Sequence, residues 1–352
     1  MPKNKHPIES YFNRLSCYHY YCFTILFFTK IPMYWHIMDL IFLSPPMKYE
    51  CEPKDNGTKA VCPCESPKWN KTVFTKTVQT KFNIVCDRVW LISFSQSMLF
   101  VGTLIGSLLF GFMSDSNGDK TSSSEAIKAK LEDYFAAQNI NLHKKLSFWQ
   151  IFRHKKLSSN LLCMAGIYFF CGMGYYGVCQ YIGNMSGNIH INVAVSGLLL
   201  IPGTIITMFL LRLMSRRMFL IATNLLSGVF MIAVICIPSN LKFVRIVVAC
   251  FGNTFFFMSF IIVFLYSVEL FPTAVRNSVL GFLSVLARVG QIAAPPINAL
   301  DSVAAGAIFG VSAMLGAVMC YPLPETKDTE LPSTLEDSET LPKGKIHLSR
   351  GE

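Results

Sequence analysis

The sequence is short of charged residues. Asp, Glu, Lys and Arg make up only 15% of its 352 residues, while 52% are hydrophobic, and soluble domains usually carry about a quarter charged residues. Several apolar runs exceed about 18 residues, the length with which an α-helix crosses a hydrocarbon core roughly 30 Å thick. We therefore expect an all-α polytopic membrane protein embedded in the lipid bilayer.

The signatures of soluble enzymes are also missing. There is no GxxxxGK[ST] phosphate-binding loop and no HExxH motif, and Cys62-Pro-Cys64 has neither the spacing nor the second pair of a zinc site. The sequence predicts no catalytic residue, no metal site and no cofactor, so we do not expect an enzyme. The net charge of +10 is attributed to loop lysines and arginines that orient membrane helices. Nucleic-acid binding is not expected, because no compact basic domain stands alone.

Twelve cysteines are too scattered for a single disulfide framework. Four of them share one hydrophilic loop: Cys51, Cys62, Cys64 and Cys86. Asn-x-Thr sequons at Asn56 and Asn70 lie in the same loop. Clustered cysteines beside sequons indicate an oxidising exterior where asparagines are glycosylated and disulfides persist. The pairing of the four cysteines is left open.

The hydropathy pattern predicts eight membrane spans, two and then six. The expected segments are a cytoplasmic tail (1–17), a first helix (18–43), an extracellular loop (44–88), a second helix (89–113), a cytoplasmic linker (114–157), a six-helix half (158–322) and a cytoplasmic tail (323–352). A cleaved signal peptide is the competing interpretation of 18–43, but that run is too long and no Ala-x-Ala site follows it. The turn 212–217 holds three arginines, whereas the turn 184–192 holds no Lys or Arg. Since basic loops stay on the cytoplasmic side, we expect both termini inside the cell. The expected location is the plasma membrane.

The end of the second expected helix carries a motif. Residues 102–118, GTLIGSLLFGFMSDSNG, resemble the signature between the second and third helices of the major facilitator superfamily. There an aspartate, here Asp115, helps to close a cytoplasmic gate. The two basic residues that complete the signature are missing, since Asp119 and Lys120 follow Gly118.

Several later segments resemble one family within that superfamily. The loop 212–217, with Arg216 and Arg217, looks like the equivalent gate loop of the second half. Residues 269–277, ELFPTAVRN, with Glu269 and Arg276, are close to the loop between helices ten and eleven of the organic cation, organic anion and carnitine transporters. Segments 82–90, 148–153 and 324–327 resemble their entry into helix two, lead into helix seven and continuation after helix twelve. Because these matches are collinear and cover most of the chain, it is identified as a member of that family.

The resemblance implies an incomplete major facilitator fold. The family has twelve helices, and the matches pass from helix two almost directly to the loop before helix seven, so helices three to six, about 100 residues, are absent. In the family, two halves rock around a substrate at the midplane. The implied function is transport of small organic ions, either by this chain alone or completed by a second copy or a full-length family member. The alternative is a transport-inactive form that regulates longer relatives.

Arg288 is the sharpest candidate for a substrate contact. It is the only charge in an apolar run, where an arginine is costly unless it faces a cavity, a partner or a substrate. Anion and carnitine transporters of the family carry arginine in a similar ARxG motif, and a guanidinium binds a carboxylate bidentately. An internal structural ion pair is the alternative.

Aromatic residues complete the implied site. Tyr175 and Tyr176 match the helix-seven tyrosine pair of the family, and anchoring at the membrane interface is the alternative. Phe260 and Phe264 match cavity aromatics of helix ten, with plain packing as the alternative. Other positions depart from the anion transporters, since Thr204 stands where many have lysine. Anions or zwitterions, such as a carboxylate or carnitine, are therefore favoured only slightly over cations.

Overall fold

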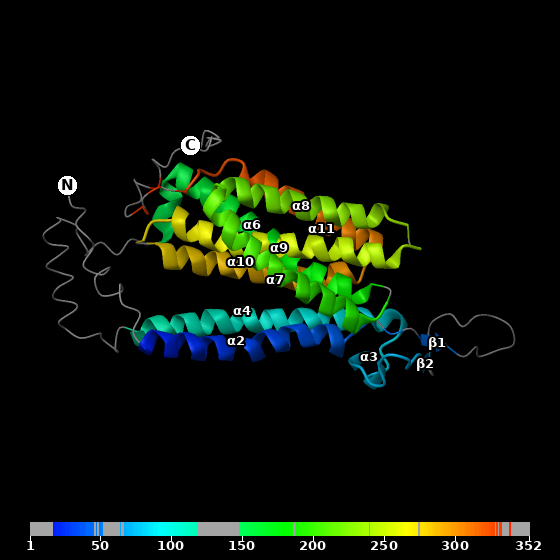
Figure 1. Cartoon of the computed structure of the whole chain (residues 1–352). Helices are drawn as coiled ribbons and strands as arrows, with labels where there is room; N and C mark the ends of the chain where they lie inside the picture. Colours follow the sequence, from blue (N-terminus) through cyan, green and yellow to red (C-terminus); the bar gives the residue numbers. More distant parts are fainter. Residues whose placement is uncertain are drawn as a thin grey trace, which may run out of the picture. The chain divides into compact units, whose positions relative to one another are not determined.

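The structure is a computed structural model (Figure 1). It describes residues 17–45, 47, 49–51, 64, 67–118, 148–185, 187–238, 240–273, 275–327, 329, 331–332 and 338. Of the residues singled out above, Asn56 and Cys62 lie outside the described residues, and so does the side chain of Asp115.

Eight helices in the described part of the chain are long and apolar enough to cross a membrane. They are α2 (Cys17–Leu43), the segment Cys86–Leu109 at the start of α4 (Trp90–Gly118), α6 (Lys155–Asn184), α7 (Ile189–Leu213), α8 (Arg216–Cys236), α9 (Lys242–Leu270), α10 (Arg276–Asn298) and α11 (Ser302–Cys320). A helix satisfies its own backbone hydrogen bonds, which is why it can span lipid. The expected class, an all-α polytopic membrane protein with eight spans, is confirmed.

Some helices run past the ends that hydropathy set. Helix α4 continues to Gly118 rather than stopping at 113, and α6 begins at Lys155 rather than 158. Hydropathy marks the apolar stretch, whereas a helix continues through polar residues as long as its backbone ladder does. These two helices thus extend into the expected linker 114–157, whose cytoplasmic location stays a prediction.

The chain divides into two compact units. One comprises Met1–Leu43 and Leu109–Lys145, of which the structure describes α2 and the last turns of α4. The other comprises Ser44–Leu108 and Leu146–Glu352. In the first unit, α2 is 27 residues long and contains Pro32. All the features discussed below belong to the second unit.

Short elements order the polar loop between α2 and α4. Strands β1 (Tyr49–Cys51) and β2 (Pro67–Trp69) pair antiparallel, and a disulfide joins Cys51 to Cys64. The helix α3 (Val78–Lys81) and the 3-10 turn η1 (Cys86–Arg88) lead into α4, and Cys86 is also disulfide-bonded. Another 3-10 turn, η2 (Phe148–Arg153), precedes α6.

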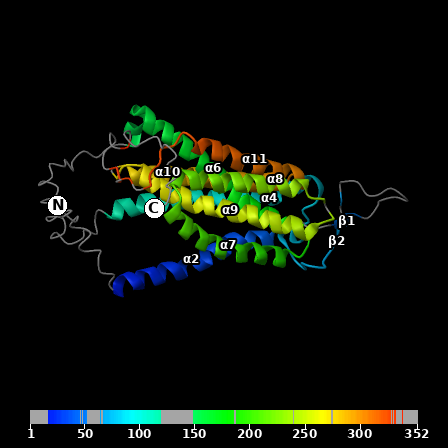
Figure 2. The ribbon, with the colours of Figure 1, turned by 45° about the horizontal axis from the view of Figure 1, so that its top comes forward.

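Helix α6 is the centre of the six-helix block. It packs against α9, α10 and α11, while α8 packs against α9 and α11 and α7 against α9 (Figure 2). Two thirds of the α6 span is buried, against 17% of the α7 span. The exposed side chains of α7 are large and apolar, among them Leu198, Ile201 and Phe209. Such a surface suits lipid, while polar side chains such as Asn224 and Asn253 are buried inside the block.

Two glycines let α6 and α10 approach closely. A Cβ added at Gly172 of α6 would collide with the backbone carbonyl of Ala287, and one added at Gly290 of α10 would collide with the backbone carbonyl of Phe169. Backbone atoms cannot move aside as a flexible side chain can, so both positions require glycine. This contact sets the register between α6 and the helix that carries Arg288.

Candidate functional site

An aromatic cluster surrounds Tyr175 of α6. Its ring centroid lies 4.9 Å from that of Tyr176, 5.3 Å from Phe257 and 6.0 Å from Phe260, the last pair being stacked. These separations are typical of favourable ring pairs. The structure thus brings together three of the four predicted aromatics and adds Phe257 of α9.

Helix α4 also contacts this region. The ring of Phe100 lies 5.7 Å from that of Tyr176, and the Ser97 hydroxyl donates a 2.9 Å hydrogen bond to the carbonyl of Ile292 in α10. Phe100 is buried. The aromatic cluster therefore joins α4, α6 and α9.

Phe264 does not join the cluster. It lies one helical turn beyond Phe260 on α9, is 53% exposed, and makes none of the ring contacts recorded among the described residues. An exposed phenylalanine on the outer face of a membrane helix suits contact with lipid.

Arg288 is half-buried near the middle of α10. Its Nη1 donates a long hydrogen bond of 3.5 Å to Oε1 of the buried Gln291. Among the described residues, no carboxylate lies within ion-pairing distance of the Arg288 guanidinium. The ion pair recorded among those residues joins Arg216 to Glu269. A guanidinium with one weak partner retains most of its five donors for another acceptor.

The register of α6 and α10 relates Arg288 to the tyrosines. Arg288 follows Ala287, whose carbonyl abuts Gly172, and Tyr175 and Tyr176 lie one turn beyond Gly172 on α6. Arg288 and the two tyrosines of the aromatic cluster therefore lie along the same stretch of the α6–α10 contact.

A second group of polar residues lies at the end of the block where α7 passes to α8. We call Arg216, Glu269, Glu325, Thr326 and Lys327 the ionic cluster. Nε of Arg216 pairs with Oε1 of Glu269 at 3.2 Å, with both side chains less than one fifth exposed. The Thr326 hydroxyl donates to the other oxygen of Glu269 at 2.7 Å.

The segment after α11 closes two helix ends in this cluster. Glu325 accepts from the backbone N–H groups of Arg216 at 2.8 Å and Arg217 at 3.3 Å, the first residues of α8. Lys327 donates from Nζ to the carbonyls of Arg212 and Leu213 at the end of α7. A carboxylate at a helix N-terminus and an ammonium at a C-terminus each complement the helix dipole and pair otherwise free backbone groups. The segment thereby fastens α7, α8 and α11 together.

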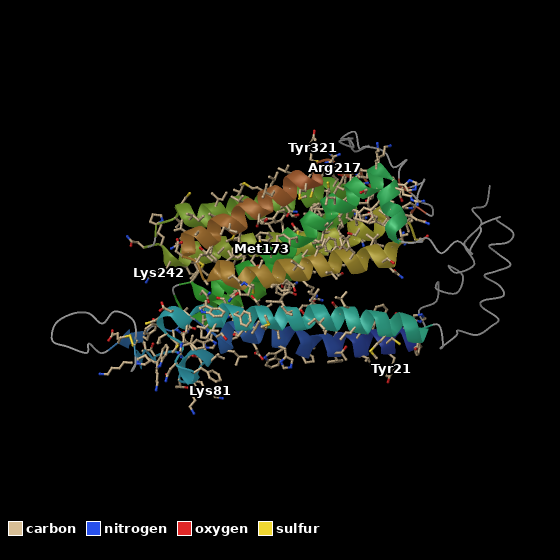
Figure 3. All side chains as sticks on the ribbon, turned by 180° about the vertical axis from the view of Figure 1, so that it is seen from behind. Tyr21, Lys81, Met173, Arg217, Lys242 and Tyr321 are labelled. Carbon is tan, nitrogen blue, oxygen red and sulfur yellow. A yellow bond between two sulfur atoms is a disulfide. The ribbon has the colours of Figure 1, made fainter. Side chains whose placement is uncertain are left out.

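The other predicted gate residues lie beside the cluster. The Arg217 guanidinium lies 5.1 Å from the ring centroid of Tyr321, a cation–π contact (Figure 3). Nε of Arg276 donates to the Phe271 carbonyl at 3.1 Å.

Several of these residues were missed by the sequence reasoning. Phe257 stands three residues before Phe260, and this helical spacing predicts that the two share a face. The sequence could therefore have predicted Phe257 as a member of the cluster. Glu325 and Lys327 appeared only as part of a family-like segment, and nothing in their own spacing shows which helix ends they cap. Gln291 lies three residues after Arg288, and the same helical spacing could have predicted that their side chains meet.

The described part of the polar loop holds one sequon. Asn70 is exposed, and its Oδ1 accepts from the backbone N–H of Thr72 at 3.1 Å. Searched over the described residues, the chain shows no group of three or more His, Cys, Asp or Glu placed to hold a metal ion.

Comparison with known proteins shows which proteins the chain resembles. No protein-family model matches it. Organic anion transporter 3 of Oryctolagus cuniculus is 32% identical over 229 residues, which cover 63% of this chain and 42% of the relative. The organic cation transporter protein of Drosophila melanogaster is 30% identical over 222 residues, covering 62% and 40%. The chain is similar to organic ion transporters.

A further relative is solute carrier family 22 member 13 of Homo sapiens, 29% identical over 195 residues that cover 54% of this chain and 35% of the relative. The resemblance stated from the motifs is thereby confirmed. The chain spans about two fifths of the length of these relatives, which is consistent with the absence of helices three to six. The relatives are named for both anions and cations, so their names do not choose between the two.

Proposed function

We propose that the chain is a membrane carrier for small organic anions and zwitterions, with Arg288 as the residue that binds the carboxylate. The observation that carries this proposal is that the Arg288 guanidinium is half-buried on an apolar helix and, among the described residues, makes a single weak hydrogen bond. A charge in such a place is costly unless something neutralises it. A substrate carboxylate supplies both the opposite charge and two acceptors in the geometry of the guanidinium fork.

The aromatic cluster supports the same substrate class. Tyr175, Tyr176 and Phe260 offer ring faces and hydroxyls next to the α6–α10 contact. An organic anion with an apolar body would place its carboxylate at Arg288 and its body against these rings. Phe264, exposed and apart from the cluster, is not included in the proposed site.

The proposed orientation places the ionic cluster on the cytoplasmic side of the plasma membrane, together with both termini. The three arginines of 212–217 favour this side. The loop that carries Asn70 and the Cys51–Cys64 disulfide would then face the exterior, where glycosylation and disulfide formation take place. In the proposed cycle, the Arg216–Glu269 pair, Arg217 and Arg276 would hold the cytoplasmic ends of the helices of the second unit in one state and release them in another. Asp115, which belongs to the first unit, stays a prediction as a gate residue.

Uptake by cells that express this chain alone tests the proposal. We expect radiolabelled benzoate and carnitine to enter faster than tetraethylammonium, because only the first two carry a carboxylate. Arg288→Gln should reduce benzoate uptake at least about tenfold, the loss of a charge-assisted pair worth roughly 1.5–3 kcal/mol. Arg153→Gln, which alters an exposed arginine of η2 outside the site, is the matched control and should leave uptake unchanged. Normal surface expression without carboxylate uptake would refute transport by the single chain.

A second candidate function is that of a membrane-embedded partner of longer relatives. It is favoured by the broad exposed apolar surface of α7 and by the span of only about two fifths of those relatives. Either a second copy or a full-length transporter would cover such a surface. Co-expression with organic anion transporter 3 separates the two candidates: a partner changes the uptake of that transporter and is recovered with it, whereas an independent carrier adds its own uptake.

A further inference from the structure

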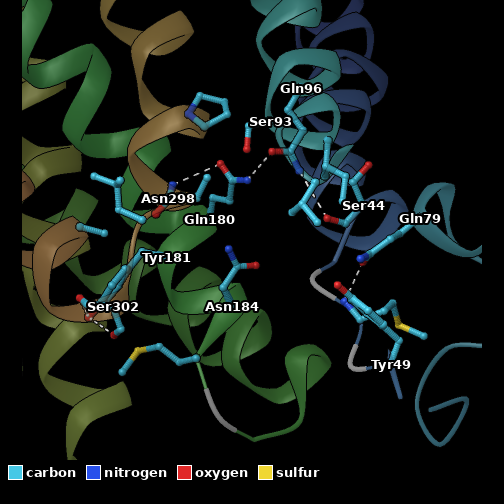
Figure 4. A pocket seen from close by; sticks show the side chains of 18 residues that line it. Ser44, Tyr49, Gln79, Ser93, Gln96, Gln180, Tyr181, Asn184, Asn298 and Ser302 are labelled. Carbon is cyan, nitrogen blue, oxygen red and sulfur yellow. Dashed lines mark hydrogen bonds between the residues drawn. The ribbon is translucent and has the colours of Figure 1, made fainter. Parts of the chain in front are cut away.

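A cavity of about 400 Å³ lies at the end of the second unit opposite the ionic cluster. Figure 4 shows its lining, which comes from the loop before α4, the first turns of α4, the last turns of α6 and α10, and the start of α11. The volume lies within the range of small-molecule sites, roughly 300–1,000 Å³. It contains none of the residues proposed above to bind the organic anion.

The lining is polar but carries no charge. Ten of its 18 residues have hydrogen-bonding side chains, and none is Asp, Glu, Lys, Arg or His. An ion that entered would lose hydration without gaining a counter-charge, which is strongly unfavourable. A neutral solute avoids that cost. The chemistry of this cavity therefore differs from that of the Arg288 site.

Three carboxamides form a fixed chain along one wall. Gln180 donates from Nε2 to Oε1 of Gln96 at 2.6 Å, and Asn298 donates from Nδ2 to Oε1 of Gln180 at 3.2 Å (Figure 4). Gln96 is 3% exposed. Asn298 also donates to the Gly177 carbonyl at 2.9 Å. These bonds fix the orientation of each amide and tie α4 to α6 and α10.

One acceptor in this row of three carboxamides is left without a hydrogen bond. Both bonds of Asn298 use its Nδ2, while its Oδ1 is buried and has no hydrogen-bond partner in the described part of the chain. A buried carbonyl oxygen without a donor is unfavourable and is rare in folded proteins. With an accessible surface below 1 Å², this oxygen is not offered to the cavity, and Asn298 acts on the wall through Nδ2, which orients the Gln180 amide.

We propose that this cavity is a binding site for a neutral small molecule that carries a carboxamide or ureide group. The ligand N–H and carbonyl would pair with amide and hydroxyl groups of the wall, among them Gln180, which Asn298 orients, Asn184 and Ser93. Apolar lining residues, Val89, Ile92 and Leu300 among them, would cover its hydrocarbon part. Because the carboxamide chain joins three helices, an occupied site stabilises their packing. This site does not depend on whether the chain transports anions.

The test measures the melting temperature of the full chain in lipid nanodiscs against increasing benzamide, with benzoate as the anionic isostere. We expect a saturable rise with benzamide and none with benzoate in the Arg288→Gln chain, in which the proposed anion site is disabled. Asn298→Leu should raise the midpoint concentration of benzamide about tenfold, the upper end for one hydrogen bond. Asn277→Leu, the same change at an exposed position of the same helix outside the cavity, should leave it unchanged.

A photoreactive 4-azidobenzamide provides a measurement on the unaltered chain, independent of whether Asn298→Leu folds. It should label peptides from the last turns of α6 or α10, and excess benzamide should suppress that labelling. The proposal is overturned if benzamide gives no saturable rise, if the two asparagine variants behave alike, if benzoate is as effective in Arg288→Gln, or if labelling falls elsewhere. Persistence of the benzamide response without anion uptake would overturn the transport proposal and leave this site intact.

Discussion

Glu269 and Arg216 form an ion pair at the end of the block where α7 passes to α8. Both side chains are mostly buried, and Glu269 also accepts from Thr326. Replacing Glu269 with Gln leaves a cation with weakened partners, so we expect the free energy of unfolding to fall by about 1.5–3 kcal/mol. A double-mutant cycle with Arg216→Gln should give a coupling energy of about 1–3 kcal/mol, measured by titration with sodium dodecyl sulfate.

Arg217 supplies the control for that cycle. It neighbours Arg216 in the sequence, but its guanidinium lies over Tyr321 rather than on Glu269. The coupling of Arg217→Gln with Glu269→Gln should therefore be close to zero. Equal coupling for the two arginines would contradict the geometry described for the ionic cluster.

The candidate site could be predicted in part from single residues. Family-like motifs picked out Tyr175, Tyr176 and Phe260, which the structure brings together. They also picked out Phe264, which lies apart. Position in a motif does not say which side chains of another helix will face a ring, and for that reason Phe100 of α4 was missed.

The contact between α6 and α10 tests the fold at the scale of the element. Gly290→Ala drives a methyl group into the backbone of α6, so we expect a loss of about 1–3 kcal/mol in unfolding free energy. Gly281→Ala is the matched control on the same helix, because nothing lies within 4 Å of its added Cβ. There the better helix propensity of alanine should gain up to about 1 kcal/mol.

Both glycine variants are compared in the same detergent titration. A similar response to the two substitutions would mean that α6 and α10 are not in backbone contact. It would also remove the argument that relates Arg288 to Tyr175 and Tyr176, since their common register rests on Gly172 and Gly290.

The existence of the helices could be predicted well, and their ends less well. Apolar runs long enough to cross a bilayer leave a chain few alternatives to helix, so eight spans were predicted from hydropathy alone. The polar ends follow different rules. Glu325 and Lys327 cap helices more than 100 residues away in the chain, and no local pattern encodes such pairings.

For the whole molecule, the central question is the role of Arg288 in the middle of α10, which has no carboxylate partner among the described residues. Burial, a single weak partner and the neighbouring aromatic cluster together favour an anion. The uncharged cavity at the C-terminal end of the same helix offers an internal contrast, because this cavity and Arg288 would select solutes of different charge.

Equilibrium binding of radiolabelled benzoate to the purified chain in nanodiscs tests this account most directly. We predict saturable binding that Arg288→Gln weakens at least about tenfold, that Arg153→Gln leaves unchanged, and that excess benzamide does not displace. The account is contradicted if benzoate does not bind saturably to the folded chain, or if Arg288→Gln binds it as tightly as the unaltered protein.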